Sequence, residues 1–196
     1  MNTLRAIETR FASWLLLGIF LLVAVGYNAL MGSNHGFIVG VGNQFAESAA
    51  DLPDARYWFI NADHLWTADE IRAWAATLTA WQLSEYRLHN AVAFQVFVLF
   101  ACIQWSLTAL LISPHLRRVG DALLLLPIVI LVVKLIEVVG IYQLLKDFEN
   151  AAPGDLATLA TVAAICTGAK LWLFMTWWLA FALAVIGGAA FRLRTV

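Results

Sequence analysis

The chain has 196 residues, of which 62% are hydrophobic and only 13% are charged, and its mean hydropathy is +0.81. A soluble domain averages roughly 45–50% apolar and about 25% charged residues, so this composition excludes an ordinary soluble protein. The formal net charge of -1 is uninformative about partners, but the absence of any run of basic residues argues against nucleic-acid binding. We therefore predict a single integral membrane domain, with the lipid bilayer as its main environment.

A short head with Arg5 and Arg10 precedes the first apolar run, which covers residues 11–31. This run is longer than the apolar core of a secretory signal peptide, and no small-x-small cleavage site follows it. We predict that it is an uncleaved first membrane span. The outer segment that follows, residues 32–87, begins irregularly because glycines recur in it. Its aromatic residues suit the membrane–water interface.

Part of this outer segment has a helical pattern. Thr67 followed three residues later by Glu70 is a capping-box pattern, which predicts the start of a helix. Apolar residues then recur at helical spacing up to Trp81. We predict an amphipathic interfacial helix over residues 67–82.

Three more apolar runs are long enough to cross a hydrocarbon core of roughly 30 Å as helices rising about 1.5 Å per residue. Pro114 ends the first of them, and Gly120 with Asp121 predicts a tight turn into the next, giving an antiparallel hairpin. The last run is too long for one upright span, so we expect it to tilt, to project from the membrane or to break near Gly168. These three predicted spans cover residues 88–112, 122–145 and 157–190, with an outer loop at 146–155.

Basic residues are distributed unevenly between the predicted spans. The outer segment and the outer loop hold four basic residues beside ten acidic ones. Lysine and arginine concentrate in cytoplasmic segments, so we predict that both termini are cytoplasmic, in a bacterial inner membrane. The predicted fold is all-α, an antiparallel bundle of four transmembrane helices with an amphipathic interfacial helix in the first outer loop. The arginines of the predicted cytoplasmic segments are Arg5, Arg10, Arg117, Arg118, Arg192 and Arg194.

The third span carries two charges, Lys134 and Glu137, on one helix face and close enough to pair. A charge at the centre of a span costs roughly 2.5–3.5 kcal/mol on insertion scales, so such residues suggest function. Counting about 1.5 Å per residue from the cytoplasmic arginines places five polar groups from four spans in the outer half of the membrane. We predict that they converge on a ligand- or partner-binding site, which comprises Asn28, Gln95, Lys134, Glu137 and Lys170.

Two ammonium groups and one carboxylate leave an excess of one positive charge in this set. That excess suits a lipid headgroup, a quinone or an acidic side chain of a partner subunit. We expect Lys170 to face inward and to share Glu137 with Lys134. Two other interpretations compete: Lys134 and Glu137 neutralise each other and only define helix register, or Lys170 extends to the outer interface. A third interpretation is that these charged residues form a path for protons or other ions.

Small residues repeat every four positions at Ala160, Ala164 and Gly168, a spacing that lets helix backbones approach closely. We predict helix packing within the bundle there, with an intermolecular contact as the alternative. No catalytic nucleophile, metal-ligand cluster or cofactor motif occurs, which favours a role other than catalysis. Cys102 and Cys166 lie in apolar runs and are interpreted as packing residues.

The layout of four spans, a long first outer loop and a short second one resembles that of claudin-type tetraspan proteins in topology. The outer-loop cysteine pair of those proteins is absent here. The periplasmic cysteines of the four-helix disulfide-forming membrane oxidoreductases are also absent. The sequence is therefore assigned to no family.

The leading functional hypothesis is a non-catalytic membrane subunit that binds and stabilises a larger membrane protein complex. The first alternative is a small transporter or channel for protons or other ions that uses Lys134 and Glu137. The second is a quinone- or lipid-binding membrane protein. No cofactor or metal is predicted, and a bound lipid or quinone is the ligand class that the polar set would suit.

Overall fold

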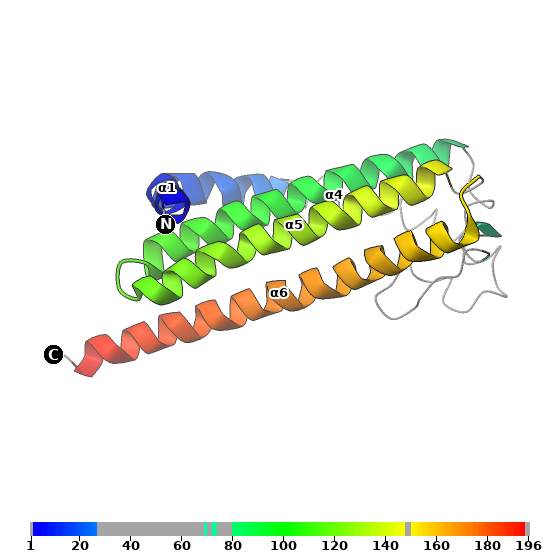
Figure 1. Cartoon of the computed structure of the whole chain (residues 1–196). Helices are drawn as coiled ribbons and strands as arrows, with labels where there is room; N and C mark the ends of the chain where they lie inside the picture. Colours follow the sequence, from blue (N-terminus) through cyan, green and yellow to red (C-terminus); the bar gives the residue numbers. More distant parts are fainter. Residues whose placement is uncertain (1, 27–68, 70–71, 74–79, 148–149, 195–196) are drawn as a thin grey trace. The chain divides into compact units, whose positions relative to one another are not determined.

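The computed structural model of the protein describes residues 2–26, 69, 72–73, 80–147 and 150–194 (Figure 1). Helices account for nearly all of these residues, and none of them lies in a β-strand, which confirms the all-α class for the described part. A further helix, Trp14–Gly26, follows the first element. The other elements are α1 (Asn2–Phe11), α4 (Ala80–Leu107), the π-helix η1 (Thr108–Ile112), α5 (Arg117–Asp147) and α6 (Pro153–Arg194).

Several of these helices have the length and composition of membrane spans. Three qualify individually, namely Phe94–Ile112, Arg117–Lys146 and Pro153–Gly188. A fourth candidate is the pair Thr3–Phe11 and Trp14–Gly26, which is bent by 81°. The protein thus has three or four candidate spans, as expected for an integral membrane protein. Most of the predicted outer segment 32–87, with its helix at 67–82, lies outside the described residues.

The first predicted span needs a correction at its start. Residues before position 11 form helix α1, and a break at residues 12–13 separates it from the 14–26 helix. Ser13 causes the new start, because its Oγ accepts a hydrogen bond from the Leu16 N–H at 3.3 Å, as an N-cap residue does. The apolar run alone did not reveal this cap, because Ser13 is a single polar residue within it.

The turn between the second and third spans lies earlier than predicted. It occupies residues 113–116, and α5 already begins at Arg117. Gly120 therefore lies inside α5, where it packs against the turn. A Cβ atom at this position would lie 2.6 Å from Ser113 Oγ and 3.0 Å from Ser113 Cα. Glycine is needed for this close approach and does not bend the chain.

The last apolar run forms one helix without a break at Gly168. Helix α6 has 42 residues, which corresponds to a length of about 63 Å. Pro153 stands at its first position, where the missing N–H is not needed, and Asp155 in the first turn suits the positive end of the helix dipole. The predicted loop 146–155 is therefore shorter, because α5 extends to Asp147 and α6 begins at Pro153.

The chain folds into two compact units, and α4, α5 and α6 each contribute a part to both. Unit 1 comprises Met1–Gly26, Gln95–Val133 and Lys170–Val196, and unit 2 comprises Tyr27–Phe94 and Lys134–Ala169. The core of unit 1 gathers residues from η1, α5 and α6. Its buried members are Ile112, Leu123, Trp177 and Ala184.

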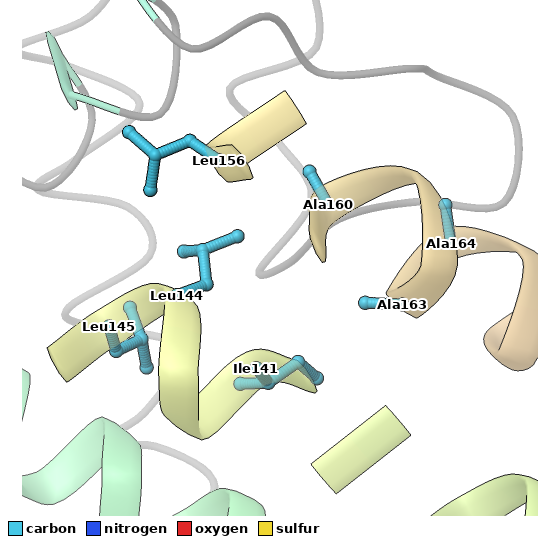
Figure 2. Packing of buried hydrophobic residues seen from close by; sticks show 7 residues of the cluster. All are labelled: Ile141, Leu144, Leu145, Leu156, Ala160, Ala163 and Ala164. Carbon is cyan, nitrogen blue, oxygen red and sulfur yellow. The ribbon is translucent and has the colours of Figure 1, made fainter. Parts of the chain in front are cut away.

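The core of unit 2 lies between α5 and α6, as Figure 2 shows. Large side chains of α5, including Leu144 and Leu145, pack against a face of α6 that is mostly alanine. Ala160 and Ala164 of that face are 0% and 2% exposed. Small side chains allow the two backbones to come close. A Cβ atom on Gly140 of α5 would in fact lie 3.9 Å from a backbone oxygen of α6.

Candidate functional site

The charged residues of α5 form an ion pair inside unit 2. Lys134 Nζ lies 3.2 Å from Glu137 Oε2, and the two side chains are only 4% and 5% exposed. The i, i+3 spacing places both on one helix face, which is why the pair closes within a single helix. Each charge offsets the other, so the pair lowers the cost of burying both of them among apolar helices.

Helix α6 contributes to the same group in unit 2. The Thr167 hydroxyl donates a hydrogen bond to Glu137 Oε1 at 2.8 Å, so one carboxylate oxygen faces an ammonium and the other faces a hydroxyl. Glu137 thereby links α5 to α6. We refer to Lys134, Glu137 and Thr167 as the charged junction. Thr167 was not predicted as a site residue, and its only sequence signal was a polar residue within an apolar helix.

Two of the other predicted polar residues belong to unit 1. Lys170 belongs to unit 1, where it is 7% exposed and its Nζ lies 5.3 Å from the centroid of the Phe97 ring, in a cation–π arrangement. Gln95, also in unit 1, is exposed. Asn28 lies outside the described residues. The convergence of all five groups, and the sharing of Glu137 between Lys134 and Lys170, stay predictions.

The predicted packing residues lie on α6. Ala160 and Ala164 pack within the core of unit 2, whereas Gly168 is half-buried and is not a member of that core. The contact is therefore made by the first two small residues and by Ala163, which is 0% exposed.

A second polar feature, which the sequence analysis missed, lies in unit 1 around Pro127. Proline has no N–H, so Pro127 cannot donate the helical hydrogen bond to the carbonyl of Leu123 four residues earlier. The indole of Trp177, from α6, donates to that carbonyl at 2.9 Å and is itself fully buried. A proline inside a membrane helix is tolerated when a neighbouring helix satisfies the freed group in this way.

A second indole donates to the next carbonyl of α5. Trp105 of α4 donates from Nε1 to the Leu124 oxygen at 2.9 Å. Helices α4 and α6 thus each supply one tryptophan to the same turn of α5. We call Pro127, Leu123, Leu124, Trp105 and Trp177 the proline junction. The available sequence signal was Pro127 itself, since its position identifies which carbonyl needs a donor.

Polar side chains also line the end of α4 and the π-helix η1. Among the described residues, Gln104 Nε2, Thr108 Oγ1 and Ser113 Oγ are buried and make no hydrogen bond. Ser106 differs, because its hydroxyl donates to the Cys102 carbonyl at 2.9 Å. The π-helix closes with a bond from the Ser113 N–H to the Thr108 carbonyl at 3.0 Å.

No group of three or more potential metal-ligating side chains occurs within the described ranges. The strongest polar features on the described helices are therefore the charged junction and the proline junction. A comparison of the chain with protein family models, curated proteins and solved structures finds no match.

Proposed function

We propose that this protein is a non-catalytic integral membrane subunit that binds and stabilises a larger membrane protein complex. The observation that supports this function is the exposure of α6. Only 6% of its apolar window is buried inside the protein, against 33% for α5 and 39% for the second candidate span. An 18-residue apolar window with so little internal packing has most of its side chains available to another membrane protein.

The available face of α6 is apolar and partly aromatic. Residues at spacings of three, four and seven along it are strongly exposed, with values of 77% for Trp172, 64% for Met175, 64% for Leu179 and 65% for Ile186. This spacing produces a continuous stripe on one side of a helix, as in helix–helix seams. Aromatic and methionine side chains are enriched where proteins meet, which suits a partner helix.

Photo-crosslinking in the native membrane tests this proposal. A photoreactive phenylalanine analogue at Leu179 should give a defined, higher-mass adduct that mass spectrometry identifies as one membrane protein. The same analogue at Val132 of α5, which is 53% exposed, is the matched control and should give lipid adducts alone. Extraction in mild detergent should in addition yield an assembly larger than the chain. Lipid adducts at both positions and a small monodisperse particle would contradict the proposal.

The proposed topology is an antiparallel four-span bundle with both termini in the cytoplasm of a bacterial cell. Three arginine-bearing segments support it, because they meet at one end of unit 1. Glu8 of α1 lies 3.4 Å from Arg117 at the start of α5. A Cβ atom on Gly188, near the end of α6, would lie 4.0 Å from Leu116 of the turn.

Cysteine labelling tests this orientation. In a background without Cys102 and Cys166, a cysteine introduced at position 115 should react with an impermeant reagent only after the membrane is opened. A cysteine at position 60 should react in intact cells. The reverse pattern would overturn the orientation.

The second candidate function is proton or ion transport through the charged junction. The observation in its favour is the buried carboxylate of Glu137 inside a membrane-length helix, since intramembrane carboxylates commonly serve proton paths. In liposomes, the purified chain should then conduct protons, and Glu137→Gln should abolish the flux while Asp155→Asn, at an exposed position of α6, should not. Absence of flux in the parent chain would exclude this function.

A further inference from the structure

One end of unit 1 carries an amphipathic helix and a group of arginines. Helix α1 is bent by 81° from the 14–26 helix, so α1 runs along the membrane plane when the 14–26 helix lies along the bilayer normal. Short amphipathic helices in this orientation lie at headgroup depth. This geometry determines which side chains of α1 meet the lipid phosphates.

The apolar side of α1 faces the protein. Leu4, Ile7 and Phe11 are half-buried, and the Phe11 ring lies 5.2 Å from Trp105 and 5.9 Å from Phe20 between ring centroids. The opposite sides carry charge. Arg5 and Arg10 are both exposed, at positions that flank the apolar stripe. Helix α1 therefore presents its cations away from the protein core.

The start of α5 adds two more cations to this end. Arg117 and Arg118 are exposed, and Arg117 contacts Glu8 of α1 at 3.4 Å, so α1 and the start of α5 lie side by side. Across residues 2–13 and 113–121 the four arginines face only two acidic residues, Glu8 and Asp121, so positive charge is in excess. We call Arg5, Arg10, Arg117 and Arg118 the arginine end.

We propose that the arginine end binds the headgroups of anionic phospholipids. Guanidinium groups match phosphate oxygens in geometry, and clusters of four or more basic residues beside a membrane span attract anionic lipid. The membrane itself supplies this partner at the depth of α1. The proposal is independent of the partner subunit proposed above, because it concerns different residues and a different ligand.

Spin-label electron paramagnetic resonance on the full chain in nanodiscs tests this site. The fraction of motionally restricted lipid is compared for spin-labelled phosphatidylglycerol and spin-labelled phosphatidylcholine. Each arginine near an anionic surface contributes on the order of a fivefold preference, less where salt screens it. The parent chain should prefer phosphatidylglycerol several-fold, and 1 M salt should remove most of that preference.

The decisive variant combines Arg5→Gln, Arg10→Gln and Arg118→Gln, and keeps Arg117 because of its contact with Glu8. It should lose the preference for phosphatidylglycerol, whereas the corresponding triple lysine variant should retain it. Lys146→Gln, which removes an exposed cation at the opposite end of α5, is the matched control and should change nothing. The proposal is overturned by a glutamine variant that keeps the preference, by a lysine variant that loses it, by an equal loss in the control, or by a parent chain insensitive to salt.

Discussion

Helix α5 contains two polar interruptions, and the protein stabilises them by different means. At the proline junction in unit 1, the missing N–H of Pro127 frees a backbone carbonyl, and Trp177 of α6 donates to it. At the charged junction in unit 2, Lys134 and Glu137 neutralise each other within α5, and Thr167 adds one bond from α6. The first interruption is satisfied from another helix, whereas the second includes an ion pair between two residues of its own helix.

This difference follows from geometry. Side chains three residues apart share a helix face, so a charged pair can form whatever the neighbouring helices do. A carbonyl freed by proline points along its own helix axis, and its donor here comes from a residue of a neighbouring helix in the right register. The stability of the proline junction therefore depends on the register between helices. The stability of the charged junction depends on the balance between the charges of Lys134 and Glu137. Stability measurements can separate these two dependences.

The largest effect is expected at the charged junction. Glu137→Gln removes the negative charge that lies 3.2 Å from Lys134 while preserving side-chain shape. Breaking a buried pair from one side typically costs roughly 3–5 kcal/mol in free energy of unfolding. The double variant Lys134→Met with Glu137→Gln should recover much of that loss, because neither position of the pair then holds a buried charge. Thermal unfolding in detergent measures both; equal midpoints for the parent and the two variants would show that the pair is not buried.

The next effect is expected at the proline junction. Trp177→Phe keeps an aromatic ring beside Phe181 but removes the N–H that bonds the Leu123 carbonyl. An unsatisfied buried acceptor costs roughly 1–3 kcal/mol. In a Pro127→Ala background the loss in free energy of unfolding should be smaller, because residue 127 then has an N–H that can donate to the Leu123 carbonyl. Trp172→Phe, at a position 77% exposed, is the matched control.

A double-mutant cycle between positions 127 and 177 decides this prediction, with urea or thermal unfolding as the measurement. A coupling free energy close to zero would mean that the ring of Trp177 matters for packing alone, and the account of the proline junction would then be wrong.

A smaller effect is expected from Thr167→Val, which removes the hydroxyl bonded to Glu137 without changing side-chain shape. Hydrogen bonds between membrane helices contribute about 0.6 kcal/mol on average and up to about 1.7. We expect the free energy of unfolding to fall by about 0.5–1.5 kcal/mol, well below the loss expected for Glu137→Gln. A larger loss for Thr167→Val than for Glu137→Gln would show that the hydrogen bond from α6 matters more to stability than the ion pair within α5.

The smallest effect is expected from Trp105→Phe. The Leu124 carbonyl that accepts from Trp105 can also accept the N–H of Ile128 in the regular α5 ladder, so no acceptor is orphaned. The cost should be about 0.5–1 kcal/mol, the net contribution of an ordinary hydrogen bond. Parallel unfolding of the Trp105→Phe and Trp177→Phe variants measures the contrast. Equal losses in free energy of unfolding would show that the Leu123 carbonyl needs its indole donor no more than the Leu124 carbonyl does, despite Pro127.

Much of the fold class could be read from the sequence, because the signals are local. Apolar runs long enough to span a bilayer predict membrane helices with no knowledge of packing. The charged pair was predicted for the same reason, since the spacing between Lys134 and Glu137 already places both on one face. The helix ends were less accurate. Ser13 as an N-cap and Gly120 as a packing position were missed, because each depends on the local backbone path or on a contact with the turn.

What only the tertiary structure decided is the pairing of distant polar groups. Nothing along the chain connects Trp177 with Leu123 or Thr167 with Glu137, because each bond joins α6 to α5 across a loop. The membrane excludes water as an alternative partner, so the helices have to settle in a register that brings a donor to each freed acceptor. Local spacing determines which groups need a partner, and the packing of helices against one another determines which residue supplies it.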